Sequence, residues 1–431
     1  MGVFLVCIYI VLIFIRPMDW WEPVLNWQMV NVTAIALLGV ALPQVMGQFG
    51  KIRALPEARM AAILFPCVIM SWAPTWLGGM IMAFQEFGKV LFLYFFILFL
   101  GRELRAYRAF LWTVLLCVGW MAIHGIMQAH TGKGFGDGEP LWRGTGEEGE
   151  GVWQIRAFGI FHDPNDLCLE FIVVIPLLWS EYRTNRNVLT KILSLTILPL
   201  CIYGAWLTNS RGGIIGIFGM IAAYAVGRTK GIRRWLIASV SILMVTILMP
   251  ARGAQLGMVD RDRVVAWGDG IAAFKAYPIF GVGYGAFEDR ASNAGKAAHN
   301  SFVNALAELG LVGYIPWFLV IYVTMFHLRR GVAVISTIDR QDQLQLGALF
   351  SALVGYLTSA YFLSRSFQPP LFVLLALATC RLLIACETHN VYDRVFGPFK
   401  QEIRRGIYWA LGSVVFLWIS IRIANKMSGG G

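Results

Sequence analysis

Long runs of hydrophobic residues alternate along the chain with short polar segments. A helix needs about 20 mostly apolar residues to cross the hydrocarbon core of a bilayer. Thirteen runs reach or approach that length: 2–15, 24–46, 59–76, 86–100, 109–130, 164–180, 188–208, 213–227, 235–250, 302–326, 344–363, 370–386 and 407–421. The pattern predicts an all-α polytopic membrane protein with about 12–13 transmembrane helices, built as a single integral membrane domain over residues 1–431. The last run is short, so the sequence leaves open whether the chain crosses the membrane there.

Basic residues gather on alternate connections between these runs. With the N-terminus inside, the inner loops are 47–59, 101–108, 181–191, 228–234, 327–343 and 388–406. Those six short loops hold 20 Lys and Arg residues, whereas the longer outer loops hold 12. Such alternation is what the positive-inside rule predicts, and it fixes the expected orientation.

Composition agrees with a membrane protein and excludes other classes. Of the 431 residues, 58% are hydrophobic and 14% are charged, against about 25% charged in an ordinary soluble domain. A single soluble domain, a disordered chain and a nucleic-acid-binding protein are therefore excluded. Most of the net charge of +11 reflects topology, because 20 of the 36 basic residues lie in inner loops. The seven cysteines all lie within apolar runs without a C-x-x-C pair, which argues against disulfides and zinc.

Two outer loops are long enough to carry a site. Loop 131–163 is acidic and rich in glycine, and loop 251–301 mixes apolar, aromatic and charged residues. We expect a helix over 262–276 within the second loop, and we expect that loop to contribute to an active site, because function concentrates in loops held on a rigid scaffold.

Four arginines stand alone on the outer side: Arg156, Arg211, Arg263 and Arg365. Arg211 is the most informative, because it lies between two apolar runs, where a charge is costly. One interpretation is a snorkelling or helix-capping arginine. The other is an anion site, since guanidinium groups bind phosphate in a bidentate manner. The natural anion at this position is a lipid-linked phosphate or diphosphate.

A histidine and two short motifs offer further chemistry. His299 opens the run at 302–326, where it is either a general base for a hydroxyl or a histidine in the headgroup region. The segment His162-Asp-Pro-Asn-Asp166 holds potential metal ligands, but a helix cap by Asp163 or Asn165 is the favoured interpretation. The segment Gly281-Val-Gly-Tyr284-Gly is interpreted as a tight turn beside a substrate rather than a dinucleotide loop or a channel filter.

Four segments in order resemble the O-antigen ligase and O-antigen polymerase superfamily of bacterial envelope glycosyltransferases. Arg156 to Asn165 is similar to its G-x-F-x-x-P-N segment, and Ser210-Arg-Gly-Gly213 is similar to its S-R-G motif. Arg263 to Trp267, followed by Tyr277 to Gly283, resembles its R-x-x-x-W and P-x-x-G-x-G stretch. His299 to Gly313 resembles its H-N-x-x-L-x-x-x-x-E-x-G-x-x-G signature.

The resemblance implies a GT-C-like fold and an inverting, metal-independent transfer of a glycan from an undecaprenyl diphosphate carrier, without a cofactor. By position, Arg211 and Arg263 would hold the diphosphate, and His299 would activate the acceptor hydroxyl. The remaining substrate-binding candidates are Arg156, Asn165, Ser210, Arg261, Asn300, Arg365 and Tyr284. The acceptor would be lipid A core, a glycan or a protein, and the site would face the periplasm from the bacterial inner membrane.

Several alternatives stay open at this point. Ligase is favoured over polymerase, but the motifs overlap. Arg261 lies two residues from Arg263 and could share or replace its role. Trp142, Trp153 and Phe161 could form a cover or a sugar platform, although aromatic residues are also ordinary interface anchors. A transporter of an anionic lipid or solute is the rival class, and the internal repeats typical of transporters are not visible in the sequence.

Overall fold

The computed structural model describes residues 1–144, 151–226, 257–291 and 295–427. The helices are α1 (Gly2–Phe14), α2 (Met29–Ala54), α3 (Pro56–Met70), α4 (Leu77–Leu100), α5 (Leu104–Thr131), α6 (Pro164–Thr184), α7 (Val188–Leu207), α8 (Arg211–Val226), α10 (Gly257–Ala276), α11 (Ser301–Ile335), α12 (Arg340–Ala360), α13 (Pro369–Thr388), α14 (Tyr392–Val395) and α15 (Phe399–Met427). Short 3-10 turns occur at Pro17–Asp19, Glu22–Val24, Phe135–Asp137 and Gly159–Phe161, and a π-helical turn occurs at Phe287–Ala291. Two strands, β1 (Leu141–Gly144) and β2 (Gly151–Gln154), form an antiparallel hairpin.

The prediction of an all-α polytopic membrane protein is confirmed. Each of the predicted apolar runs coincides with a helix, except the run at 235–250, which lies outside the described residues. Within the described residues, eight helices are long and apolar enough to cross a membrane, and the last of these includes α15. The helices α3, α6, α8 and α12 do not meet those criteria, because they are too short or carry too many polar residues. Over the described residues, length and hydropathy thus support eight crossings of the 12–13 expected for the whole chain.

Several predicted loop boundaries are wrong. Residues 77–85, which separate the predicted runs 59–76 and 86–100 and would form an outer loop, are instead the first part of α4, so the two glycines near its start do not break the helix. The basic residues Lys51 and Arg53 lie in the last turn of α2 rather than in a loop. Cations at a helix C-terminus interact favourably with the helix dipole, so a basic run does not by itself mark the end of a helix.

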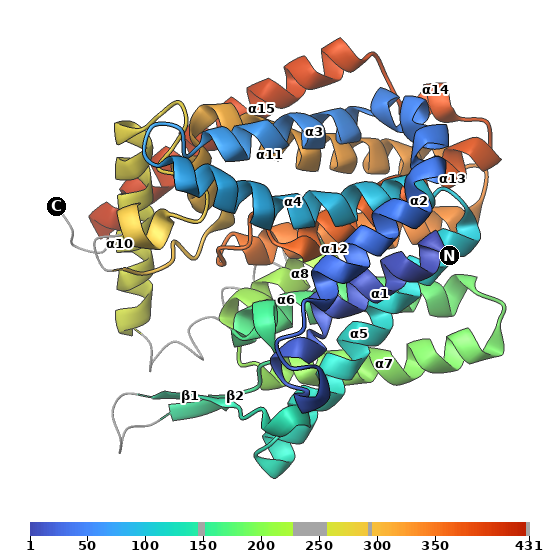
Figure 1. The fold of residues 1–431 in the computed structure, drawn as a ribbon, viewed down its shortest axis with the longest axis horizontal. Helices are drawn as coiled ribbons and strands as arrows, with labels where there is room; N and C mark the ends of the chain where they lie inside the picture. The colour runs from blue at the N-terminus through green and yellow to red at the C-terminus, as the bar shows by residue number, and fades with distance from the viewer. Residues whose placement is uncertain (145–150, 227–256, 292–294, 428–431) are drawn as a thin grey trace.

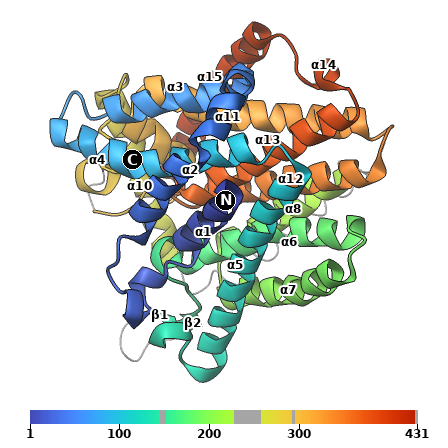
Figure 2. The same ribbon diagram turned by 45° about the vertical axis from the view of Figure 1, so that its right-hand side comes forward.

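Helix α13 lies at the centre of the bundle. Every residue from 370 to 386 is buried, and α4, α11, α12 and α5 pack around it. Figures 1 and 2 show α13 enclosed between α4, α11 and α12. A helix that is apolar on all sides must be surrounded by other helices, which explains its position in the core.

Residues from the predicted inner loops meet at one end of the bundle. Nδ1 and Nε2 of the buried His327 lie 2.7 Å from Oε1 of Glu57 and 2.8 Å from Oε2 of Glu402. Arg102 pairs with Glu387 beside this cluster. Four of the loops predicted inside supply these residues, namely Glu57, Arg102, His327 and Glu402. Their proximity supports the predicted alternation of sides.

The segments predicted outside gather at the other end. Helix α10 stands across the ends of several bundle helices at the left of Figure 1, and the β1–β2 hairpin projects from the same side. The helix expected over 262–276 is confirmed, although α10 begins earlier, at Gly257. In the hairpin, Trp142 pairs with Trp153 across the two strands.

Candidate functional site

The turn that precedes α8 is fixed by the side chain of Ser210. Its hydroxyl donates a 2.7 Å hydrogen bond to Oδ1 of Asn165 at the start of α6. The same oxygen accepts a 3.0 Å hydrogen bond from the backbone N–H of Gly213. Ser210 therefore caps α8 and joins it to α6. Arg211 is the first residue of α8, so this cap fixes the position of its backbone. The side chain of Arg211 is half-buried.

The two glycines after Arg211 allow α8 to approach its neighbours. A Cβ atom on Gly213 would lie 2.2 Å from Sγ of Cys168 in α6. A Cβ atom on Gly212 would lie 3.3 Å from Cβ of Phe362, which follows α12. The S-R-G-G segment thus brings the Arg211 backbone against both α6 and the loop after α12.

That loop is tied to α6 by a buried ion pair. Nε and Nη2 of Arg365 both donate to the carboxylate of Asp166, which is buried. Two donors of Arg365 therefore already bind a carboxylate. These contacts favour a structural role for Arg365 over the expected binding of substrate phosphate. The sequence offers Asp166 only as a potential metal ligand, and its pairing with Arg365 is seen only in the structure.

The same loop is tied to the start of α11. The backbone N–H of Arg365 donates to Oγ of Ser301 over 2.8 Å, and Ser301 Oγ donates to the carbonyl of Leu363 over 2.6 Å. Ser366 Oγ in turn donates to the carbonyl of Ser301 over 2.6 Å. Hydrogen bonds thus run from α8 through α6 and the 363–366 loop to the residues beside His299.

His299 and Asn300 form the entry to α11. Oδ1 of Asn300 accepts from the backbone N–H groups of Phe302 and Val303, at 3.0 Å and 3.1 Å, so Asn300 is the N-cap. Asn300 is buried and its oxygen serves as the cap, whereas its predicted role in binding substrate stays a prediction. His299 is half-buried and has a φ of 48°, a conformation that residues other than glycine rarely adopt. Strain of this kind is concentrated at functional sites.

Helix α10 brings Arg263 to the same end of the molecule. The ring of Trp267 contacts the ring of Tyr361 edge-on, with 5.9 Å between centroids. Arg263 is half-buried and lies one turn before Trp267, so the two share a face of α10. The side chain of Arg261 lies outside the described part of the chain.

The P-x-x-G-x-G stretch is inserted into a break in α11 at Gly310. The N–H of Leu311 donates to the carbonyl of Pro278, and the N–H of Gly283 donates to the carbonyl of Glu308, at 2.9 Å and 3.1 Å. Gly310 has φ 58° and ψ −165°, and a Cβ atom there would lie 2.4 Å from the carbonyl oxygen of Ile279. The glycines of the two motifs therefore allow two backbones to interlock.

Tyr284, predicted to bind substrate, ends this insertion. Its N–H donates to Oγ of Ser71 over 2.9 Å, and its carbonyl accepts from the indole of Trp72 at the same distance. Its ring packs against Phe87 and Phe367. These contacts give Tyr284 a structural role between α3 and the inserted loop.

The segment from His162 to Asp166 divides its side chains among four tasks. Asp163 caps α6 by accepting from the N–H of Asn165 over 2.8 Å, which confirms the favoured interpretation of this motif. Asn165 and Asp166 bind Ser210 and Arg365, as described above. Nη1 of Arg156 lies 2.8 Å from Nε2 of His162. Among the described residues, no group of three or more His, Cys, Asp and Glu side chains could hold a metal ion.

Arg156 is held by its own loop. Besides His162, its Nε donates to the carbonyl of Glu139 over 2.8 Å, and its backbone N–H donates to Oε1 of Gln128 over 3.0 Å. Arginine can only donate, so Nε2 of His162 must accept, and the ring is neutral. Burial, and after it the Arg156 guanidinium, lowers the pKa of His162 from its ordinary value of 6.5.

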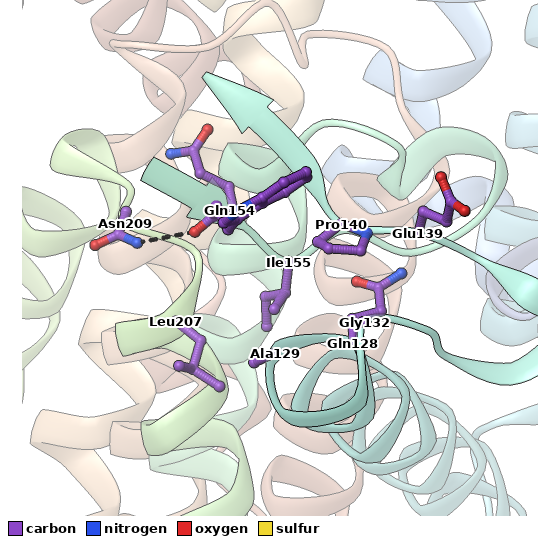
Figure 3. A pocket seen from close by; sticks show the side chains of 10 residues that line it. Gln128, Ala129, Gly132, Glu139, Pro140, Gln154, Ile155, Leu207 and Asn209 are labelled. Atoms are coloured by element: carbon purple, nitrogen blue, oxygen red, sulfur yellow. Dashed lines mark hydrogen bonds between the residues drawn. The ribbon is translucent and has the colours of Figure 1, made fainter. Parts of the chain in front are cut away.

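A pocket of about 550 Å³ lies beside the turn that carries Arg211. Figure 3 shows it between the end of α5, the β2 strand and the end of α7, with Asn209 at one edge. Trp153 lines it, whereas Phe161 is buried and packs against Phe14. Of the three aromatic residues expected to form a sugar platform, Phe161 is therefore excluded.

Taken together, the fold and these contacts define a multi-pass membrane protein in which hydrogen bonds join the segments that bear Arg211 and His299 at one end of the helices. Residues 196–318 match the sequence model of a family described as O-antigen ligase. This match covers Arg211, Arg263 and His299 and supports membership of the O-antigen ligase superfamily. It thereby supports a glycosyl-transfer function of the ligase or polymerase kind. Among curated proteins, none matches the chain.

Proposed function

We propose that this protein transfers a glycan from an undecaprenyl diphosphate carrier to an acceptor hydroxyl at the outer face of the bacterial inner membrane, as an O-antigen ligase. The observation that carries the proposal is the continuous set of hydrogen bonds from Ser210 to Ser301. It joins the segments that bear Arg211 and His299 at one end of the bundle.

In this proposal Arg211 and Arg263 bind the diphosphate of the carrier. The bond from the anomeric carbon to the phosphate oxygen breaks, and negative charge develops on the leaving diphosphate. Guanidinium groups fixed in position stabilise that charge without reorganising during the reaction. The Ser210 cap and the Trp267–Tyr361 contact hold the two arginine-bearing helices in place.

His299 acts as the general base. Its neutral imidazole takes the proton of the acceptor hydroxyl as that oxygen attacks the anomeric carbon from the side opposite the diphosphate, so the anomeric configuration inverts. General-base assistance of this kind contributes about 10²–10⁴-fold to the rate. Asn300 caps α11 directly after His299 and so limits the motion of its backbone.

Reconstitution tests the proposal. The purified protein in proteoliposomes receives the undecaprenyl-diphosphate-linked glycan and, in separate samples, lipid A core, a free glycan or a protein as acceptor. Transfer of one block to lipid A core is the expected result. Growth of the glycan in length would instead identify a polymerase, and no consumption of the carrier with any acceptor would refute glycan transfer.

A further inference from the structure

We infer that the pocket in Figure 3 is a carbohydrate subsite that binds a sugar unit next to the diphosphate arginines. The inference rests on the proposed function for the identity of the substrate. The pocket belongs to the β1–β2 hairpin and to the ends of α5 and α7, and Asn209 connects it to the turn before Arg211.

The charge of the pocket favours a neutral polar ligand. Its lining residues are Gln128, Ala129, Gly132, Glu139, Pro140, Trp153, Gln154, Ile155, Leu207 and Asn209. None of them is a cation, and Glu139 contributes a carboxylate, so the lining itself offers a phosphate group no opposite charge. The diphosphate and the pocket's ligand therefore require different parts of the protein, even though Asn209 and Arg211 are two residues apart.

The mixture of one indole, three amides and a carboxylate suits a sugar. Trp153 is 58% exposed and offers an apolar face, which its cross-strand neighbour Trp142 supports at 5.0 Å between ring centroids. The C–H face of a pyranose packs on such a ring, while amide and carboxylate groups exchange hydrogen bonds with its hydroxyls. A volume of about 550 Å³ lies within the usual range for small-ligand sites.

A buried acceptor in the pocket wall has no partner. Nε2 of Gln154 donates to the carbonyl of Thr208 over 2.9 Å. Its Oε1 is buried and accepts no hydrogen bond from the described residues. Buried polar atoms are nearly always paired, so this oxygen requires a donor. A sugar hydroxyl would supply one once the Gln154 amide turns toward the pocket.

The turn at Asn209 connects this pocket to the arginine. Asn209 has a φ of 50°, and its Nδ2 donates to the carbonyl of Trp153 over 3.3 Å, so the pocket wall and the turn before Arg211 are joined directly. A glycan whose diphosphate is bound at Arg211 would thus extend toward the hairpin. The sugar could belong to the donor glycan or to a glycan acceptor, since both present the same chemistry.

Binding measurements on the full-length protein in detergent test the inference. The probes are bare undecaprenyl diphosphate, the same carrier with its glycan, the glycan released from the carrier, and the delipidated core oligosaccharide. The glycan-bearing carrier is expected to bind about tenfold more tightly than the bare carrier, as one or two added hydrogen bonds predict. Trp153→Ala and Gln154→Leu should reduce that difference to about twofold or less while leaving the affinity for the bare carrier unchanged.

Val152→Ala is the matched control, because Val152 is an exposed neighbour in the same strand and does not line the pocket. The inference is overturned if the two carriers bind equally, or if the pocket variants bind all the sugar-bearing probes as the wild type does. A third outcome separates the subsite from the proposed function. If a released oligosaccharide binds but neither carrier does, and the pocket variants no longer bind that oligosaccharide, the subsite stands and the proposed function fails. If the pocket variants lose affinity for the released glycan, the donor is the source of the sugar. If they lose affinity for the core oligosaccharide, the acceptor is the source.

Discussion

The hydroxyl of Ser210 donates a 2.7 Å hydrogen bond to the side-chain oxygen of Asn165, which lies 45 residues earlier in the chain. Both side chains are buried, and Ser210 also caps the helix that starts with Arg211. Two of the predicted substrate-binding residues therefore bind each other. Their contribution to function would be to position Arg211 rather than to touch the substrate.

This relationship predicts strong coupling between the two residues. Ser210→Ala removes the cap and leaves the Asn165 oxygen without its donor, while Asn165→Ala removes the other partner. Each change should lower the turnover of glycan transfer about tenfold, because losing a buried hydrogen bond costs about 1–3 kcal/mol. The double variant should lose little more than either single variant. A double-mutant cycle on the turnover number measures this, and losses that simply multiply would contradict it.

Arg365 is predicted to stabilise the fold rather than bind phosphate. Arg365→Ala or Asp166→Ala leaves one buried charge of the pair without its partner, which costs about 3–5 kcal/mol. In detergent, the unfolding temperature should fall markedly for each single variant and by less for the double variant. If Arg365 instead binds the diphosphate, Asp166→Ala should tighten carrier binding, and that result would reject the structural role.

The interlock at Gly310 should not tolerate a side chain. In Gly310→Ala, the new Cβ atom would meet the Ile279 carbonyl at 2.4 Å, in a backbone conformation that is essentially restricted to glycine. We expect a loss of folded protein in the membrane, measured by size-exclusion chromatography. Gly347→Ala in α12 is the control, since nothing lies within 4 Å of a Cβ atom there, and helix propensity favours alanine by up to about 1 kcal/mol. Equal yields of both variants would show that the loop is not inserted as described.

The contact between His162 and Arg156 predicts sensitivity to acid. Burial and Arg156 lower the pKa of His162 below its unfolded value of 6.5. The folded state therefore disfavours the protonated ring, so the stability that the neutral ring contributes is present above pH 6.5 and is lost as the pH falls below that value. His162→Gln keeps a neutral acceptor. Its unfolding temperature should fall less than that of the wild type between about pH 7 and pH 5, and parallel curves would contradict the assignment.

The sequence predicted the helices more accurately than the contacts between them. Hydropathy found the helical runs because a span must be apolar along its whole length, and the charge alternation separated the two ends of the bundle. Neither signal shows which polar side chains pair. The structural roles of Asp166 and Ser301 cannot be seen in the sequence, because their partners, Arg365 and the 363–366 loop, are distant along the chain.

The glycine motifs likewise do not reveal their contacts in the sequence. Gly281 and Gly310 were recognised as parts of separate motifs, but only the fold shows that they meet. The pocket beside Asn209 combines a hairpin with the ends of two helices, and none of these segments alone carries a binding motif. The sequence does not show the structural contacts of Asn300 and Arg365, because capping and pairing use the same side-chain chemistry as substrate binding.

The central claim is that Arg211 and His299 serve one reaction at one site. The most direct measurement is the single-turnover rate of glycan transfer from undecaprenyl diphosphate in proteoliposomes, together with carrier affinity, for Arg211→Ala and His299→Ala. The controls are Arg340→Ala and His130→Ala, which change exposed residues. We predict that both site variants lose at least about 10²-fold in rate, that only Arg211→Ala weakens carrier binding, and that the controls retain wild-type rates. Undiminished transfer by either site variant would contradict the claim.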